Sequence, residues 1–353
     1  MPDLPHGVHG RPPTLAERWA AFRASPFLPA TVLTLILAAA AGLFAGSYTY
    51  AMANPTPHTV PVAVVGAYDQ PQGVRFVAGM EKALAASLRL HAFGSRSAAE
   101  QAVDDQRVFA VLDVPAPGRT ITVDVSGASG ETVAQVLTQA AMTTGKAAGV
   151  PVVVHDLKPL QQGDPRGLAI FYVSLAAVVI GFIGAIQLSV HAAALNPLAR
   201  IAFTVVYALL GGFVIAAVVD WLLGALRLPF VESWLILTLT MFTTGMVFTM
   251  FNTLFGRWAM LPTWVLLVML GNPSSGGAVS WPLLPSLLGV VGRWLPPGAS
   301  VNAQHTAVYF PGHQHAFPFL VLAGWIVVSC TVFGFRHRRH PGDRPGHPAH
   351  AAP

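Results

Sequence analysis

Residues 167–190 read GLAIFYVSLAAVVIGFIGAIQLSV, without a single charged side chain. An apolar run of about 20 residues is long enough for an α-helix to cross the hydrocarbon core of a bilayer. The rest of the chain is similar in character, because 54% of its 353 residues are hydrophobic and only 10% are charged. In a soluble domain about a quarter of the residues are charged. The sequence therefore predicts a polytopic α-helical membrane protein.

Five more apolar runs flank this one, so we predict six transmembrane segments. They cover residues 27–50, 167–190, 201–226, 233–255, 258–270 and 317–335. The fifth is short, because at 1.5 Å per residue it covers only about 20 Å of a ~30 Å core. The first ends near AMA (51–53), which resembles a signal-peptide cleavage site. Its apolar stretch exceeds the 7–15 residues of a signal peptide, so we interpret it as an anchor.

The basic residues near the predicted spans are unequally distributed between the two sides. One side carries Arg11, Arg18, Arg23, Arg200, Arg257, Arg336, Arg338, Arg339 and Arg344, whereas the short loops of the other carry Arg227 and Arg293. Lys and Arg accumulate in cytoplasmic loops, so both termini are predicted to be cytoplasmic and residues 54–166 external. The abundant alanine, glycine and proline indicate a GC-rich bacterial genome. We therefore expect a multi-pass protein of the bacterial inner (plasma) membrane.

The two ends of the chain are predicted to contact lipid. In the cytoplasmic tail, residues 1–26, Leu15, Trp19 and Phe22 are spaced as i, i+4 and i+7, which is typical of a helix lying in the membrane interface. The alternative is a basic flank with ordinary aromatic residues. The tail 336–353 is basic and rich in His and Pro, and it is expected to approach anionic head groups. Metal capture by its histidines, His337, His340, His347 and His350, is an alternative.

The external segment 54–166 is predicted to be a small α/β domain. Four runs have β-type composition: VPVAVVG (60–66), VFAVLDV (108–114), TITVDVS (120–126) and VPVVVHD (150–156). Residues 75–89 and 131–146 have helical spacing, with Val77, Met80, Leu84 and Leu88 on one face of the first helix. The turn DQPQG (69–73) lacks the G-x-G-x-x-G pattern of a dinucleotide site. We therefore expect a rigid module without a cofactor.

The stretch GNPSSGGAVSWPLLPSLLGVVGRWLPPGASVNA, residues 271–303, is apolar but broken by Gly and Pro. Irregular backbone at membrane depth must be buried in protein or line a cavity. We predict a re-entrant outer segment that completes the fifth span, with a half-helix over 281–295 and a stop at Pro296–Pro297. An external linker is the alternative. The residues expected to form this gate are Gly271, Asn272, Pro273, Gly276, Gly277, Pro285, Pro296 and Pro297.

These features together resemble the membrane subunit of type-2 ABC exporters, in the phage-infection-protein-like branch. The resemblance rests on the VPVAVV opening of the external domain, on the exit LKPLQQGDPRGLAIFYVSLAAVVIGFIGA (157–185), on GNPSSGG followed by LPP, and on a single closing span. It implies external re-entrant helices over a translocation path, two paired halves or a homodimer, and a separate cytoplasmic ATPase subunit. It also implies coupling through a short helix in the loop 191–200, where Asn196, Pro197 and Arg200 are the candidates.

The polar residues within the spans have two interpretations each. Asp220 either marks a substrate path, or it reaches the outer interface or pairs with Arg227 or Arg293. Thr238, Gly245, Thr249 and Asn252 share one helical face, which could line a path or provide helix contacts. Ser174, Ala177, Gly181 and Gly184 form a similar face that we assign to packing. His313 and His315, near His305, are weak evidence for metal.

The function that these features favour is an exporter of amphipathic or lipid-like substrates. No G-x-x-x-x-G-K-[ST], G-x-S-x-G or H-E-x-x-H motif occurs, and the only cysteine, Cys330, lies in an apolar run. We therefore expect no enzyme activity on this chain. The basic residues lack the aromatic interleaving of a nucleic-acid surface. The alternatives are a membrane scaffold or receptor that uses its external domain, and a proton-coupled exporter centred on Asp220.

Overall fold

The computed structural model describes residues 14–53, 57–116 and 119–339, and the chain divides into two units, Met1–Ser47 and Tyr48–Pro353. The first unit contains α1 (Leu15–Ala24) and most of α2 (Phe27–Met52). A capping box begins α1: the Thr14 hydroxyl accepts the Glu17 amide at 3.3 Å, and the Glu17 carboxylate accepts the Thr14 amide at 2.7 Å. The predicted helix is confirmed, and its place in the interface stays a prediction. The predictions for Arg11 and for the tail beyond residue 339 lie outside the described residues.

Five helices in the described part of the chain are long and apolar enough to cross a membrane. They are α2, α6 (Ala169–His191), α7 (Pro197–Ala217) with the π-helical η2 (Val218–Leu222), α8 (Phe230–Phe255) with η3 (Gly256–Trp258), and α12 (Ala316–Arg339). The segment predicted as the fifth span is a shorter apolar helix, made of α9 (Met260–Trp264) and the π-helical η4 (Val265–Gly271). A membrane-embedded protein is therefore supported, and the sixth crossing stays a prediction.

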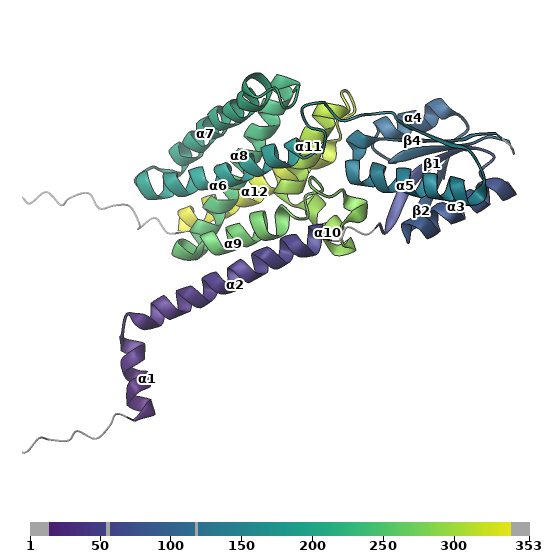
Figure 1. Ribbon diagram of the computed structural model, residues 1–353. Coiled ribbons are helices and arrows are strands. Elements are labelled where there is room, and N and C mark those ends of the chain that lie inside the picture. Colours follow the sequence, from purple (N-terminus) through teal and green to yellow (C-terminus); the bar gives the residue numbers. More distant parts are fainter. Residues whose placement is uncertain (1–13, 54–56, 117–118, 340–353) are drawn as a thin grey trace, which may run out of the picture. The chain divides into compact units, whose positions relative to one another are not determined.

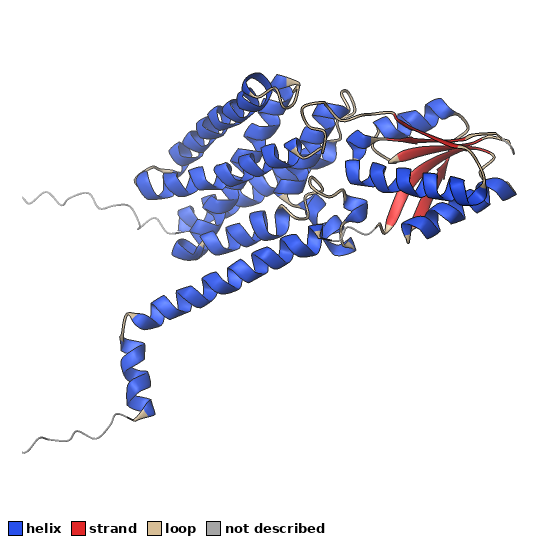
Figure 2. Cartoon of the chain, viewed as in Figure 1, coloured by secondary structure: helices blue, strands red, loops and turns tan. Residues whose placement is uncertain are grey.

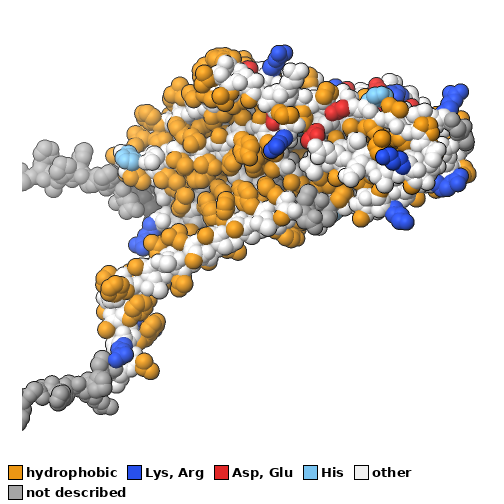
Figure 3. All heavy atoms as spheres, viewed as in Figure 1, with side chains coloured by type: hydrophobic (Ala, Val, Ile, Leu, Met, Phe, Trp, Pro, Cys, Tyr) orange, Lys and Arg blue, Asp and Glu red, His pale blue; other side chains and the backbone are white. Residues whose placement is uncertain are grey.

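Helix α8 lies at the centre of the helical part and contacts α6, α7, α11 and α12 (Figure 1). Small residues bring α6 close to it: a Cβ at Gly181 would meet the Met241 backbone at about 2.7 Å, and Ser174 and Ala177 are buried. The packing interpretation of this face of α6 is thereby confirmed. On the face shown in Figure 3, the surface of the helices is covered by hydrophobic side chains, whereas Lys, Arg, Asp and Glu gather on the sheet domain.

A five-stranded sheet is inserted between α2 and α6 (Figure 2). Its strands are β1 (Thr59–Gly66), β2 (Ser87–Ala92), β3 (Ala110–Val114), β4 (Ile121–Val125) and β5 (Val152–Asp156), in the order β2-β1-β3-β4-β5. Only the β3–β4 pair is antiparallel. The four strands predicted from composition are confirmed. We call residues 59–156 the sheet domain.

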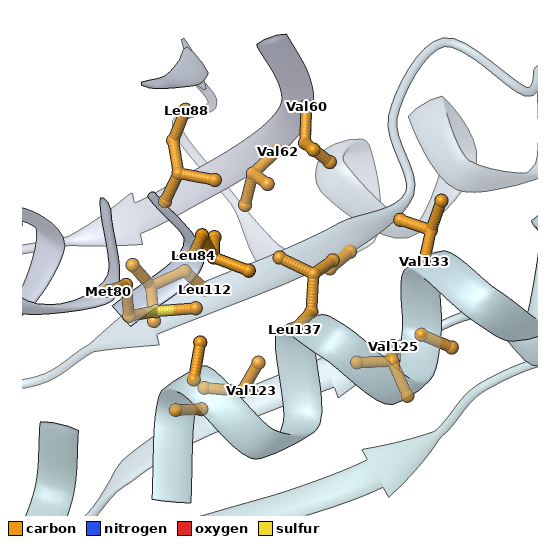
Figure 4. Packing of buried hydrophobic residues seen from close by; sticks show 14 of the residues in the cluster. Val60, Val62, Met80, Leu84, Leu88, Leu112, Val123, Val125, Val133 and Leu137 are labelled. Atoms are coloured by element: carbon orange, nitrogen blue, oxygen red, sulfur yellow. The ribbon is translucent and has the colours of Figure 1, made fainter. Parts of the chain in front are cut away.

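Helices cover both faces of this sheet. On one face, α3 (Pro71–Leu84) and α5 (Glu131–Ala148) pack Met80, Leu84 and Leu137 against Val62, Leu112 and Val123 (Figure 4). On the other, α4 (Arg96–Asp104) packs Ala99, Ala102 and Val103 against β1 and β3. Each fully buried Leu, Met or Phe contributes about 1.5–3 kcal/mol relative to exposure. The domain therefore has a core of its own.

The predicted helix over residues 75–89 is wrong at its C-terminal end. Helix α3 ends at Leu84, because Ala85 adopts a left-handed conformation with φ of 52°. Leu88, which continues the helical spacing, lies instead in β2, where it is the register partner of Val60. Leu88 fits the spacing of a helix as well as that of a strand, and the pairing with β1 places it in a strand.

The predicted half-helix over 281–295 is also wrong, because it is divided into three short pieces. These are η5 (Trp281–Leu283), α10 (Ser286–Val291) and η6 (Gly292–Trp294). Pro296 and Pro297, predicted to stop a helix, instead begin α11 (Pro296–Tyr309) at positions where proline is favoured. Helix α11 is largely buried and contacts α6, α8 and α12. Two hydrogen bonds join it to α8: Thr240 Oγ1 to Ser300 Oγ at 2.8 Å, and Gln304 Nε2 to the Ser233 carbonyl at 2.7 Å.

Candidate functional site

A cavity of about 630 Å³ lies where the sheet domain meets residues 275–309. This volume is within the ~300–1,000 Å³ range of small-molecule sites. Its walls come from the start of β1, from Arg89 of β2, from residues 106–109, from the turn before α5, from residues 160–170, from the broken segment after η4, and from α11. Parts of the chain that are distant in sequence therefore form one concave surface.

The turn between β4 and α5 forms the wall on the side of the sheet domain. Ser126 Oγ accepts the Ser129 amide at 3.2 Å, and Asp156 Oδ1 accepts the Gly127 amide at 3.0 Å, so the turn is held in place. Gly130 caps α5 without a side-chain hydrogen bond. The first N–H groups of an α-helix have no partner within the helix. The first N–H groups of α5 and the carboxylate of Glu131 therefore lie beside the cavity.

Glycines allow the broken segment to fold back on itself at the opposite wall. Gly276 has φ of 82°, a conformation that side-chain-bearing residues rarely adopt, and a Cβ there would meet the Trp281 ring at 2.6 Å. Trp281 donates Nε1–H to the Ser274 carbonyl at 3.3 Å. The Arg293 guanidinium lies over its ring, 4.7 Å from the centroid, which is a cation–π contact.

Helix α11 contributes Asn302, His305 and Tyr309 to the cavity. Burial lowers the pKa of His305 to about 4, although a hydrogen bond with the Ala128 backbone opposes this shift. Burial also raises the pKa of the Tyr309 hydroxyl to about 12. Both side chains are therefore neutral at pH 7 and offer hydrogen bonds without charge.

The cavity wall holds more cations than anions. Arg89, Arg107, Arg166 and Arg293 line it, together with one carboxylate, Glu131. Arg107 pairs with Asp105 at 3.1 Å. Within the part of the chain that the structure describes, the other three arginines form no ion pair within 4.0 Å. Desolvation lowers the pKa of Arg293, but an arginine remains cationic.

Direct hydrogen bonds fasten the sheet domain to the helices around the cavity. Gln106 Nε2 donates to Thr306 Oγ1 at 2.8 Å, and His313 Nδ1 lies 3.1 Å from Asp105 Oδ1. Gln161 exchanges two hydrogen bonds with the Arg227 backbone, at 2.7 and 3.2 Å. The relative position of the two walls is thereby fixed by polar contacts as well as by the apolar contacts of Leu283 and Leu284 with the sheet core.

A second charged cluster in the sheet domain is satisfied internally. The fully buried Asp124 carboxylate lies 2.6 Å from Arg96 Nη2 and 3.3 Å from His155 Nδ1, and Arg96 also bonds Glu100 at 2.8 Å. This cluster joins α4 to the sheet. No group of three or more His, Cys, Asp or Glu that could hold a metal ion occurs among the residues described.

The predicted gate residues lie close to one another. A Cβ at Gly271 would meet Pro297 Cγ at 2.6 Å, so the end of η4 touches the start of α11. Gly276 and Gly277 line the cavity. Asn272, Pro273 and Pro296 are buried, whereas Pro285, just before α10, is half-buried. The structure thus brings Gly271 into contact with Pro297 and places Gly276 and Gly277 at the cavity.

The predicted path residues lie apart from the cavity and take part in helix packing. A Cβ at Gly245 would meet the Gly181 carbonyl at 3.2 Å, and Thr249 Oγ1 donates to the Gly245 carbonyl at 2.9 Å. Thr238 Oγ1 would contact a Cβ at Gly212, and the Asn252 carbonyl accepts the Gly256 amide. The structure favours the helix-contact interpretation of this face.

Asp220 lies in η2 and is half-buried. Among the described residues it forms no ion pair within 4.0 Å, so the predicted pairing with Arg227 or Arg293 is wrong. Arg227 bonds Gln161 through its backbone, and Arg293 stacks on Trp281. Asp220 thus lies in a π-helical turn, where the backbone departs from the regular α-helix of α7.

The coupling helix expected between α6 and α7 is not formed. Residues 192–196 make a turn, and the three coupling candidates begin α7. Asn196 Oδ1 accepts the Ala199 amide at 2.8 Å, Pro197 is the first helical residue, and the Arg200 amide bonds the Asn196 carbonyl at 2.9 Å. Asn196 thus caps α7, and Pro197 and Arg200 lie in its first turn.

The cavity arginines and the α11 residues Asn302, His305 and Tyr309 were not predicted to share a site. A signal existed in SGASGE (126–131), a glycine- and serine-rich turn between a strand and a helix. Arg293 was considered only as a charge near a span and as a possible partner of Asp220, and Arg166 only as part of the stretch 157–185, so nothing local shows that they face the same space. In comparisons with known proteins, the chain matches no family model and no curated protein.

Proposed function

We propose that this protein is the membrane component of an exporter similar to type-2 ABC permeases, which moves amphipathic or lipid-like substrates outward. The observation that carries the proposal is the position of α11. This helix follows the broken segment, is buried against α6, α8 and α12, and lies adjacent to the cavity. Irregular backbone next to apolar helices is found where a path or cavity must be lined. The gate residues then form the outer closure of a path.

The proposed orientation places both termini in the cytoplasm of a bacterial cell and the sheet domain outside, with six crossings. The contacts at the two ends of the helices support it. Gln161 bonds Arg227 near the sheet domain, whereas Arg336 Nη1 donates to the Leu254 carbonyl at 3.3 Å at the other end. The second end also carries Arg200 and Arg257, as the positive-inside rule requires of a cytoplasmic face.

The energy would come from a separate ATPase subunit, because the chain has no phosphate-binding loop motif. Two copies, or this chain and a paired half, would complete the exporter. Membrane lipids are its surroundings and belong to the substrate class proposed. The short turn at 192–196 offers little surface to such a subunit, so this part of the proposal has the least support.

Export is tested by deleting the gene and complementing it with variants. Wild type and Gly94→Leu, where an added Cβ meets nothing within 4 Å, should restore export of a fluorescent phospholipid analogue and of amphipathic drugs. Gly271→Leu, which would displace Pro297, should not. An ATPase should copurify and be stimulated by the protein. The proposal is rejected if no ATPase copurifies and deletion leaves lipid and drug export unchanged.

A receptor or scaffold is the second candidate, favoured by the absence of a coupling helix beside a sheet domain with its own core. Photo-cross-linkers at exposed positions of α3 and α4 in living cells would then capture one specific surface partner. Capture of no specific partner, together with intact export activity, would eliminate this candidate.

A further inference from the structure

We infer that the cavity between the sheet domain and α11 binds the phosphate-bearing head group of an anionic amphiphile. The inference deepens the export proposal, on which its biological meaning rests, but the binding itself is measured without transport. It is carried by the arginines that lack a carboxylate partner, by the neutral polar side chains that line the same cavity, and by an apolar surface beside α10.

The charge of the cavity selects anions. Arg89, Arg166 and Arg293 have no carboxylate within 4.0 Å in the described chain, and Glu131 is the acid that lines the same space. Glu131 already accepts a hydrogen bond from Gln135 at 2.7 Å. Low-dielectric walls concentrate the field of such charges. An anion entering here would gain Coulomb energy, whereas a cation would meet an excess of like charge.

Phosphate is favoured by the geometry of arginine. The guanidinium fork presents paired N–H donors that match phosphate oxygens, and it does so more specifically than a lysine amine. Arg293 is oriented by its contact with Trp281, so part of its ordering cost is already met before a ligand arrives. The cavity contains no lysine among its lining residues.

Neutral polar side chains line the cavity beside the arginines. They are Asn302 and His305 of α11, Ser129 of the turn and Ser275 of the broken segment. Asn302 offers its side-chain amide N–H groups, whereas the neutral His305 ring bonds the Ala128 backbone and the Ser275 hydroxyl donates to the Asn272 carbonyl at 2.7 Å. These groups surround the space from both walls, so the ligand would bridge the sheet domain and α11.

The attached ligand is an amphiphile because the cavity opens onto apolar surface. Ile170, Leu284 and Val290 line its wall beside the arginines. On α10, Val290 and Leu287 are 62% and 72% exposed, which leaves an apolar strip next to the cavity. A volume of about 630 Å³ accommodates a head group, and an acyl chain would then lie along this strip.

Binding is measured on the purified full-length protein in a non-ionic detergent. The probes are dihexanoyl phosphatidic acid, dihexanoyl phosphatidylcholine and inorganic phosphate, titrated by isothermal calorimetry. Arg166→Gln and Arg293→Gln test the cavity, and Arg75→Gln, an exposed arginine of α3 outside it, is the control. Circular dichroism and thermal melts establish whether each variant folds. If Arg293→Gln does not fold, Arg166→Gln, which lies in a surface turn, still decides the test.

We expect phosphatidic acid to bind the wild type and Arg75→Gln equally, and each cavity variant about tenfold or more weakly. Phosphatidylcholine, whose charge is balanced, should bind more weakly than phosphatidic acid. If inorganic phosphate bound as tightly as phosphatidic acid, the anion site would stand, but the inference that its ligand is an amphiphile would be overturned. The inference is overturned entirely if phosphatidic acid does not bind, or binds the cavity variants as tightly as the wild type. Binding with no export would instead reject the export proposal alone.

Discussion

At the scale of single residues, His305 links the stability of the cavity to pH. Its pKa is about 4 in the folded protein, against a usual value of about 6.5, because burial disfavours the imidazolium. The unfolded chain therefore binds a proton between pH 6.5 and 4 that the folded protein does not. This contribution to stability is complete above pH 6.5 and is lost as the pH falls toward 4.

The expected loss from this one group between pH 7 and pH 5 is about 2 kcal/mol. We predict that His305→Gln flattens the dependence of Tm on pH in this window, because glutamine has no proton to take up. His91→Gln, at an exposed position, is the control and should keep the wild-type slope. Thermal melts in detergent at half-unit intervals measure both. Identical slopes for wild type and His305→Gln would show that the imidazole is not buried in the neutral form.

At the scale of elements, the fold of the broken segment depends on Gly276. Gly276 and Gly312 have nearly the same backbone angle, with φ of 82° and 83°, but only Gly276 faces a neighbour, the Trp281 ring. We predict that alanine costs about 1–2 kcal/mol of left-handed strain at either site. At Gly276 it should cost about 1–3 kcal/mol more, because Trp281 must move. A larger fall in Tm for Gly276→Ala than for Gly312→Ala, with altered tryptophan fluorescence in Gly276→Ala alone, would agree, whereas equal effects of the two variants would contradict the contact.

The elements that the sequence predicted are those with a strong local pattern. The long apolar helices and the valine-rich strands were found because length and composition determine them. Strand β2 was missed because Leu88 also fits the spacing of α3, and only the pairing with β1 ends the helix. Pro296 and Pro297 were read as a stop, although proline is also typical of a helix start. The cavity could not be predicted, because Arg89, Arg166 and Arg293 meet only through tertiary packing.

At the scale of the whole molecule, the contact between Asp105 and His313 limits how often the chain crosses the membrane between the sheet domain and residues 310–315. The number of these crossings must be even. His313 lies against Asp105, so these residues are on the side of the sheet domain. In the proposed topology α6, α7 and α8, which are each long and apolar enough to span a membrane, cross it once, which leaves the chain on the opposite side at Trp258. The chain must therefore return between Trp258 and Phe310. The apolar helix in this interval is α9 with η4, followed by the broken segment and α11, although at 1.5 Å per residue Met260–Gly271 covers only about 18 Å.

This parity argument predicts the outcome of cysteine labelling in intact cells. In a Cys330→Ala background, single cysteines replace Ser97 on α4, Ala194 in the turn before α7, and Pro311 after α11, all at exposed positions. A membrane-impermeant maleimide should label Ser97→Cys and Pro311→Cys directly, and Ala194→Cys only after permeabilisation. If Pro311→Cys instead behaves like Ala194→Cys, the return through η4 does not occur and the Asp105–His313 contact cannot form. Because the label reports sidedness and not activity, this result would stand whatever the protein transports.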